Sequence, residues 1–208
     1  MASAAAGDSS RLALVVGNNA YTSSPLDNAA NDARAIAEVL QRAGFSVDLK
    51  LDTTRQTLIA AIDAFGKRVA GPDIELALFY YAGHGVQIDW RNYLLPVDVA
   101  VRSADDIKDQ CIDLGRLLGH LSKAKGKSHV VILDACRNNP FGASYRPAQA
   151  ARASFDAPPG SLLAYAARRQ DAWRRTAATA NTGSTPSTCC VNWRHRNAAG
   201  RRPSARAP

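Results

Sequence analysis

Apolar runs and amphipathic segments alternate along the first 166 residues of the chain. Short runs rich in apolar, β-branched and aromatic residues predict strands at 11–17, 45–51, 74–83, 129–136 and 161–167. Between them, apolar residues at helical spacing predict helices within 26–45, 52–71 and 111–126. Strands that alternate with helices predict a mostly parallel sheet with helices on both faces, which is a three-layer α/β/α sandwich.

Particular residues indicate where some of these elements begin, turn or end. Asp52 is the expected N-cap of the second helix, and residues 86–99 predict a β-hairpin. Gly83 and Gly85 flank His84 where the central apolar strand is expected to end. Because glycine weakens strand interiors, we expect the chain either to turn sharply there or to leave room for something that approaches its backbone.

The charge of the chain is concentrated at one end. The formal net charge is +8, yet residues 1–166 hold equal numbers of basic and acidic residues. Residues 167–208 hold nine Arg and a single acid, Asp171. The predicted domain is therefore neutral, and the overall charge is a poor argument for a nucleic-acid partner.

The cysteines and the N-terminus indicate the cellular compartment in which the protein is expected. The cysteines are Cys111, Cys136, Cys189 and Cys190, and no CxxC spacing occurs among them. This favours a reduced compartment over a disulfide framework. No apolar run is long enough to span a membrane, and no intact signal peptide precedes the first strand, so we expect a cytoplasmic protein without a membrane partner.

His84 and Cys136 are the candidate reactive residues. Each follows an apolar strand, and the carboxyl ends of parallel strands meet at one edge of the sheet, where ligands bind. An imidazole and a thiol within reach there form a nucleophile–base pair, and Gly85 can present its N–H to an oxyanion. The alternative is a small buried cysteine and a loop histidine. Metal-ligand spacing, a P-loop and a GxGxxG motif are all absent from the sequence, so no cofactor is expected.

Several motifs together resemble the caspase-like cysteine peptidases, in the bacterial branch related to metacaspases. "YYAGHG" is followed by "LDACRNNPF", whose cysteine lies 52 residues after the histidine. "ALVVGNNAY" and "NAANDARAIAEVLQRAGF" are similar to the first strand and helix of the family, and "RNYLLPVD" to its segment after the histidine. The resemblance covers roughly residues 11–166 and implies a peptidase of the caspase fold that acts on a polypeptide substrate.

The resemblance also implies roles for single residues. His84 would be the general base or acid, Cys136 the nucleophile, and the N–H groups of Gly85 and Cys136 the oxyanion hole. Asp32 and Asp134 match metacaspase acids that line the P1 pocket, which implies cleavage after Arg or Lys. Asp32 could instead be a solvated helix acid, and Asp134 a turn residue that bonds its own backbone.

A calcium requirement is a further possibility that the resemblance raises, because some metacaspases need this ion. The candidate acids in this chain are Asp105, Asp106 and Asp109. They fit a solvated loop equally well, so no calcium site is assigned to them.

Residues 167–208 depart from the family, which continues with a helix and a strand that complete the substrate cleft. This segment has no helical or strand period, which predicts a disordered basic extension. A frameshift near residue 167 is the sharper hypothesis. If the reading frame is shifted to begin at the third base of each codon, the codons of Cys189–Cys190 and of Asn192–Trp193 each encode Leu. Leucines at these places fit the amphipathic helix that the family has and this chain lacks.

We therefore expect a peptidase domain at 11–166, with activity impaired by loss of its C-terminal part. One alternative is a caspase-fold interaction module without catalysis. The other is nucleic-acid binding through the tail at 167–208.

Overall fold

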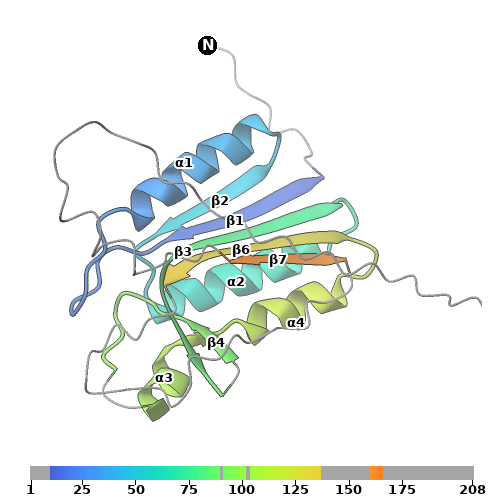
Figure 1. Ribbon diagram of the computed structural model, residues 1–208. Helices are drawn as coiled ribbons and strands as arrows, with labels where there is room; N and C mark the ends of the chain where they lie inside the picture. Colours follow the sequence, from blue (N-terminus) through green and yellow to red (C-terminus); the bar gives the residue numbers. More distant parts are fainter. Residues whose placement is uncertain (1–9, 90, 102–103, 137–159, 166–208) are drawn as a thin grey trace, which may run out of the picture.

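The centre of the molecule is a parallel sheet. The computed structural model describes residues 10–89, 91–101, 104–136 and 160–165. Its parallel strands are β1 (Arg11–Gly17), β2 (Ser46–Leu51), β3 (Leu76–Ile88), β6 (Ser128–Cys136) and β7 (Ser161–Tyr165) (Figure 1). They lie in the order β2-β1-β3-β6-β7, each parallel to its neighbours. The mostly parallel sheet expected from the sequence is confirmed.

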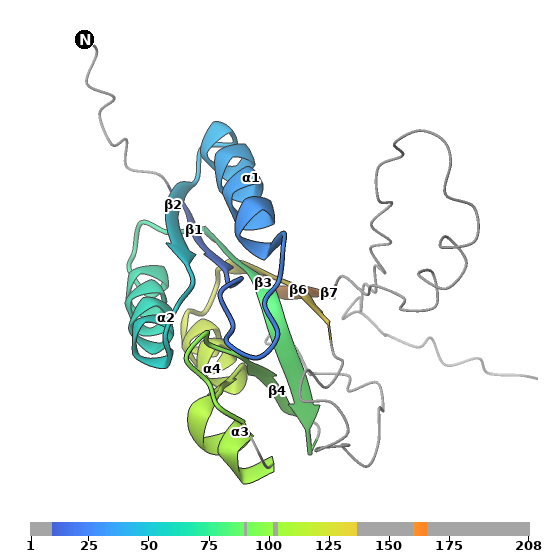
Figure 2. The same ribbon diagram turned by 90° about the vertical axis from the view of Figure 1, so that its left-hand side faces the viewer.

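Helices cover both faces of this sheet, as predicted. α1 (Ala29–Arg42) lies on one face, and α2 (Arg55–Val69) and α4 (Gly115–Lys123) lie on the other (Figures 1 and 2). On the α1 face, small helix residues such as Ala33 and Ala37 pack against strand residues such as Val15 and Tyr80. On the opposite face, Leu58, Ile62, Phe65 and Val69 of α2, together with Leu117, Leu118 and Leu121 of α4, join a larger apolar core.

A smaller antiparallel sheet extends from one end of the parallel sheet. β3 runs on past its parallel neighbours and turns back into β4 (Arg91–Leu94), which in turn pairs with β5 (Ile112–Asp113). This confirms the predicted hairpin. α3 (Ala104–Gln110), which the sequence did not predict, supplies Ile107 to a third apolar cluster with Val86 and Tyr93. No helix among the described residues is long and apolar enough to cross a membrane.

The expected end of the central strand is wrong. β3 does not stop at Gly83 but continues through both glycines to Ile88. The backbone of Gly83 has no positive φ, so it makes no turn that requires glycine. Glycine is needed there for space, because a Cβ on Gly83 would lie 2.7 Å from the hydroxyl oxygens of both Tyr21 and Tyr81.

The expected N-cap of α2 is also wrong. The cap is Thr54, whose side-chain oxygen accepts a hydrogen bond from the N–H of Thr57. Asp52 has a φ of 48° and instead accepts hydrogen bonds from the N–H groups of Asn19 and Ala20, at 2.7 and 2.9 Å. It thus ties the segment before α2 to the loop after β1, close to the candidate site.

Candidate active site

The two candidate reactive residues occupy opposing positions on adjacent strands. The parallel register of β3 and β6 pairs His84 directly with Cys136, at the carboxyl end of β6 and of the part of β3 that pairs with it. Neighbouring strands lie about 4.8 Å apart, so the backbone places the two residues next to each other. The expected placement on neighbouring strands at one sheet edge is therefore what the structure has. The roles of the two residues stay a prediction.

The imidazole of His84 is held by a backbone carbonyl. Its Nε2 lies 2.7 Å from the carbonyl oxygen of Ser24, in the loop between β1 and α1. A carbonyl oxygen can only accept a hydrogen bond, so Nε2 carries the proton and Nδ1 of the neutral ring has the free lone pair. Burial lowers the pKa of His84 below its usual 6.5, which the hydrogen bond to Ser24 partly offsets. The ring is therefore neutral, and able to accept a proton, near pH 7.

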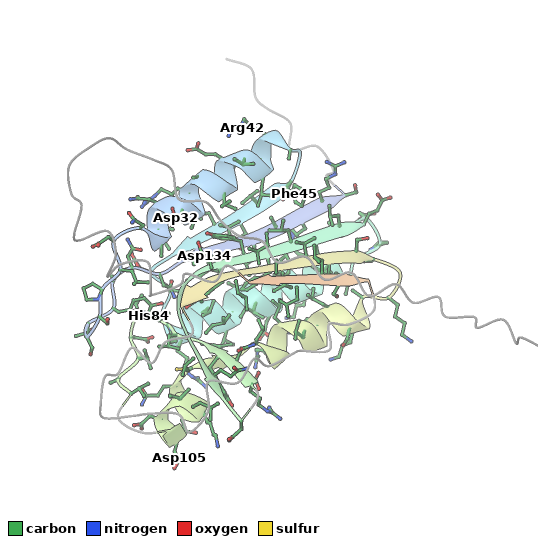
Figure 3. The ribbon with its side chains drawn as sticks, in the orientation of Figure 1. Asp32, Arg42, Phe45, His84, Asp105 and Asp134 are labelled. Carbon is green, nitrogen blue, oxygen red and sulfur yellow. The ribbon has the colours of Figure 1, made fainter. Side chains whose placement is uncertain are left out.

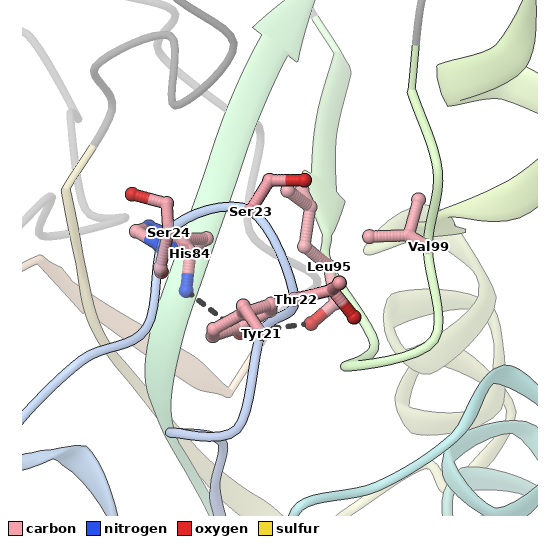
Figure 4. A pocket seen from close by; sticks show the side chains of 7 residues that line it. All are labelled: Tyr21, Thr22, Ser23, Ser24, His84, Leu95 and Val99. Carbon is pink, nitrogen blue, oxygen red and sulfur yellow. Dashed lines mark hydrogen bonds between the residues drawn. The ribbon is translucent and has the colours of Figure 1, made fainter.

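The same imidazole packs against an aromatic ring. The ring centroids of Tyr21 and His84 are 4.4 Å apart, with their planes tilted by 51°. Figure 4 shows the two rings beside Ser24, in a small pocket that is also lined by Thr22, Ser23, Leu95 and Val99. His84 itself is 8% exposed. Its orientation is therefore set by tertiary contacts and not by solvent.

The main chain of His84 is bonded by two tyrosine hydroxyls. The N–H of His84 donates to the Tyr21 hydroxyl at 2.9 Å, and the Tyr81 hydroxyl lies 2.9 Å from the His84 carbonyl oxygen. The same carbonyl oxygen accepts from the N–H of Leu95 at 3.1 Å. Burial raises the pKa of Tyr21 to about 12 and raises that of Tyr81 well above its usual 10, so both hydroxyls stay protonated.

The peptide bond between His84 and Gly85 determines the direction in which the N–H of Gly85 points. In a trans peptide the N–H points opposite to the preceding carbonyl. The His84 carbonyl is directed toward Leu95 and Tyr81, so the N–H of Gly85 is directed to the other side of β3, where β6 lies. That is the side of Cys136, the position that an oxyanion donor needs.

The two acids predicted for substrate binding lie at the same end of the molecule. Asp134 follows Ile132 on the face of β6 that packs against the α1 side, and its Oδ2 accepts a hydrogen bond from the Tyr80 hydroxyl at 3.3 Å. Asp32 lies in the first turn of α1. Figure 3 shows both acids and His84 at one end of the sheet. Each acid is half-buried, so neither is a fully solvated surface charge.

The acids considered for calcium lie on α3 and not in a loop. Asp105 and Asp109 are exposed, and Asp106 is half-buried. Within the described residues, no group of three or more His, Cys, Asp or Glu side chains could hold a metal ion. Whether the chain needs calcium stays a prediction.

Cys111 is the other cysteine among the described residues, and its surroundings differ from those of a nucleophile. It is 4% exposed, and burial raises its pKa to about 12. A thiol in that environment stays protonated and unreactive. Residues 137–159 and 167–208, with Cys189, Cys190 and the predicted tail, lie outside the described residues.

Sequence reasoning missed the residues that hold His84. Ser24 acts through its carbonyl oxygen, which every residue has, so nothing in the sequence could single it out. Tyr21 and Tyr81 have no feature in the sequence that separates them from ordinary core aromatic residues, and both are buried. The one available signal was Gly83, whose missing side chain makes room for both hydroxyls.

A family model for the caspase domain matches residues 10–195. The chain belongs to the caspase-domain family of peptidases. This confirms the resemblance and the α/β fold class inferred from the sequence. The match runs beyond residue 166, where the sequence predicts the end of the domain, and that boundary stays a prediction. The bacterial, metacaspase-related branch also stays a prediction.

Two curated proteins are similar to this chain over part of their length. The mucosa-associated lymphoid tissue lymphoma translocation protein 1 of Homo sapiens is 29% identical over 134 residues, as is its homolog from Mus musculus. The match covers 61% of this chain and 15% of either relative. The chain thus corresponds to a small part of these proteins.

Solved structures give more distant likenesses. A protein from Geobacter sulfurreducens matches with a TM-score of 0.48 and 23% identity, over 61% of this chain and 50% of that one. The Drosophila initiator caspase Dronc matches with a TM-score of 0.48 and 14% identity, over 74% of this chain and 54% of that one.

Proposed function

We propose that this caspase domain is a cysteine endopeptidase in which Cys136 attacks the peptide and His84 transfers the proton. The observation that carries the proposal is the register of β3 and β6, which pairs the two residues at the carboxyl edge of the sheet. The bond from His84 Nε2 to the Ser24 carbonyl supports it further, because it leaves Nδ1 as the basic atom.

The chemistry would follow the usual course of acyl transfer. His84 Nδ1 takes the proton of the Cys136 thiol, and the sulfur bonds to the scissile carbonyl carbon. The N–H of Gly85 stabilises the resulting oxyanion. The C–N bond then breaks as the imidazolium gives its proton to the leaving amine. Water, deprotonated by the same imidazole, hydrolyses the thioester and restores the thiol.

We further propose that the preferred P1 residue is Arg or Lys. Asp134 and Asp32 are half-buried acids at the same end of the sheet as His84 (Figure 3). A planar guanidinium bonds carboxylates bidentately, and an ammonium pairs with them as a point charge. An acidic P1 side chain would be repelled by both, so cleavage after Asp is not expected.

The experiment is peptide cleavage by the full chain. Fluorogenic peptides with Arg, Lys, Asp or Leu at P1 are compared for the unaltered protein, Cys136→Ala and the control Cys111→Ala. Cleavage after Arg and Lys that Cys136→Ala abolishes and Cys111→Ala retains supports the proposal. Equal cleavage by Cys136→Ala would show that the nucleophile is misassigned.

If no cleavage is seen, a second measurement distinguishes an impaired enzyme from an interaction module. The chain is treated with a peptidyl chloromethyl ketone that carries Arg at P1, and the modified residue is identified by peptide mass spectrometry. Modification at Cys136 without turnover indicates an impaired enzyme. Binding of the parent peptide with neither modification nor turnover contradicts the proposal and favours an interaction module.

A further inference from the structure

We propose that Tyr21 and Tyr81 form a clamp on the main chain of His84 and act as positioning residues for the reaction. Tyr21 positions the imidazole, and Tyr81 positions the N–H of Gly85. Gly83 is the residue that makes room for the clamp. This inference rests on the proposed function, because it assigns parts to residues that support the same site.

The two tyrosine hydroxyls form hydrogen bonds with the N–H and the carbonyl oxygen of His84. Tyr21 accepts the hydrogen bond of the His84 N–H at 2.9 Å, and Tyr81 reaches the His84 carbonyl oxygen at 2.9 Å. The two hydroxyl oxygens are 3.2 Å apart, and each also lies within 3.0 Å of the Leu95 carbonyl oxygen. Both tyrosines are 6% exposed or less, so water does not compete for these bonds.

Tyr21 controls the imidazole more directly than Tyr81 does. Its ring packs on the His84 ring at a centroid distance of 4.4 Å, and its hydroxyl holds the His84 N–H. Tyr21 and Ser24 belong to the same loop after β1, so the loop contacts both the ring face and the Nε2 edge. Loss of the Tyr21 hydroxyl would leave a buried donor without its acceptor and would free the loop to shift.

Tyr81 acts on the oxyanion donor through the geometry of a single peptide. The His84 carbonyl and the Gly85 N–H belong to the same planar unit, so a group that fixes the first fixes the second. Tyr81 and the N–H of Leu95 both bond that carbonyl. Removing the Tyr81 hydroxyl should therefore loosen the Gly85 N–H and leave the Tyr21 contact on the imidazole in place.

Gly83 explains why the strand contains glycine at this point. A Cβ there would lie 2.7 Å from each tyrosine hydroxyl and 2.9 Å from Cζ of Tyr81, distances that real Cβ atoms essentially never show. An alanine would therefore push the hydroxyls away from His84. Removing the two oxygens relieves the hydroxyl contacts but leaves the contact with Tyr81 Cζ. The loss of stability caused by Gly83→Ala should therefore be smaller, although not zero, in the Tyr21→Phe, Tyr81→Phe background than in the unaltered chain.

The first test measures alkylation of Cys136 by iodoacetamide from pH 5 to 9 in the full chain. Peptide mass spectrometry follows each cysteine separately, and no turnover is needed. Tyr21→Phe should lower the rate at pH 7 by about fivefold and move the apparent thiol pKa upward. The matched control is Tyr93→Phe, because Tyr93 is also 6% exposed and lies in the same apolar cluster as Tyr21, but its ring does not stack on His84.

The second test separates Tyr81 from Tyr21. A peptidyl aldehyde with Arg at P1 forms a hemithioacetal with the thiol, and its oxygen needs the Gly85 N–H, whereas iodoacetamide does not. Aldehyde affinity is measured by protection of Cys136 from alkylation, with the peptidyl alcohol as a control that cannot react. Tyr81→Phe should weaken the aldehyde about fivefold and leave the alkylation profile unchanged.

The outcomes distinguish a failure of the clamp from a failure of the proposed pairing of His84 with Cys136. If unaltered Cys136 titrates as an ordinary thiol and His84→Ala has no effect on it, the proposed function fails. If His84→Ala raises the thiol pKa but Tyr21→Phe behaves like Tyr93→Phe, the clamp is wrong. Equal costs of Gly83→Ala with and without the two hydroxyls, measured by urea unfolding and alkylation, would also overturn it.

Discussion

The charge of Asp134 gives the sharpest test of substrate preference. Asp134→Asn keeps the shape of the side chain and an oxygen that accepts the 3.3 Å hydrogen bond from Tyr80, but it removes the charge. A buried, hydrogen-bonded charge pair loses about 2–5 kcal/mol when one partner is removed. Asp134 is half-buried, so the lower end, about 2 kcal/mol, applies, and kcat/KM for Arg substrates should fall about 30-fold.

The assay compares two substrates that differ only in charge at P1. Arg and its neutral isostere citrulline are placed in the same fluorogenic peptide, and kcat/KM is measured for the unaltered chain and for Asp134→Asn. The preference for Arg should collapse in the variant, with little change for citrulline. Asp48→Asn is the control, since this acid is 38% exposed, pairs with Lys50 on β2 and is remote from the site.

Two results would contradict this prediction. If Asp134→Asn retains the full preference for Arg over citrulline while Asp32→Asn loses it, the pocket carboxylate is Asp32. If both variants retain the preference, the selectivity does not come from these acids at all. The proposal for Arg or Lys at P1 would then fail, although the pairing of His84 with Cys136 would be unaffected.

Asn18→Ala should destabilise the fold by about 3 kcal/mol in urea unfolding, since a buried side chain loses two bonds to Thr53 and one to a carbonyl. The free energy of unfolding should decrease as the pH falls through 6.5. Burial lowers the pKa of His84 and His129, so below 6.5 the unfolded chain binds more protons than the folded one. Cys111 should resist iodoacetamide at pH 8 in the native protein, because burial raises its pKa to about 12. EGTA should leave peptide cleavage unchanged, because the described acids form no metal cluster.

Each of these outcomes has a clear contrary result. Asn31→Ala, at an exposed residue, is the control for Asn18→Ala, and equal stabilities of the two variants would show that the buried bonds contribute nothing. Stability that rises between pH 7 and 5.5 would contradict the histidine argument. Alkylation of Cys111 at the rate of a free thiol would show that the apolar cluster around it opens readily. Loss of activity in EGTA, restored by calcium, would reveal an ion site outside the described acids.

The sequence by itself determined most of the strands and helices of this protein and the sheet edge on which the candidate reactive residues lie. Apolar runs such as 11–17 and 129–136, and the helical spacing of Leu58, Ile62 and Phe65, are local patterns, and the structure has strands and a helix there. Local patterns suffice because side-chain alternation follows from the geometry of each element. The placement of His84 and Cys136 at the carboxyl edge of the parallel sheet then followed from the rule for open parallel sheets.

The tertiary structure decided the register and the backbone contacts. The direct pairing of His84 with Cys136 depends on how β3 and β6 align, and a shift of one residue would leave both strand patterns intact while it moved the pair apart. Ser24 contributes a carbonyl oxygen, and a backbone atom has no signature in a sequence. The sequence left open whether Gly83 makes a turn or leaves room for an approaching group, and only the fold showed that it leaves room for two hydroxyls from distant or neighbouring residues.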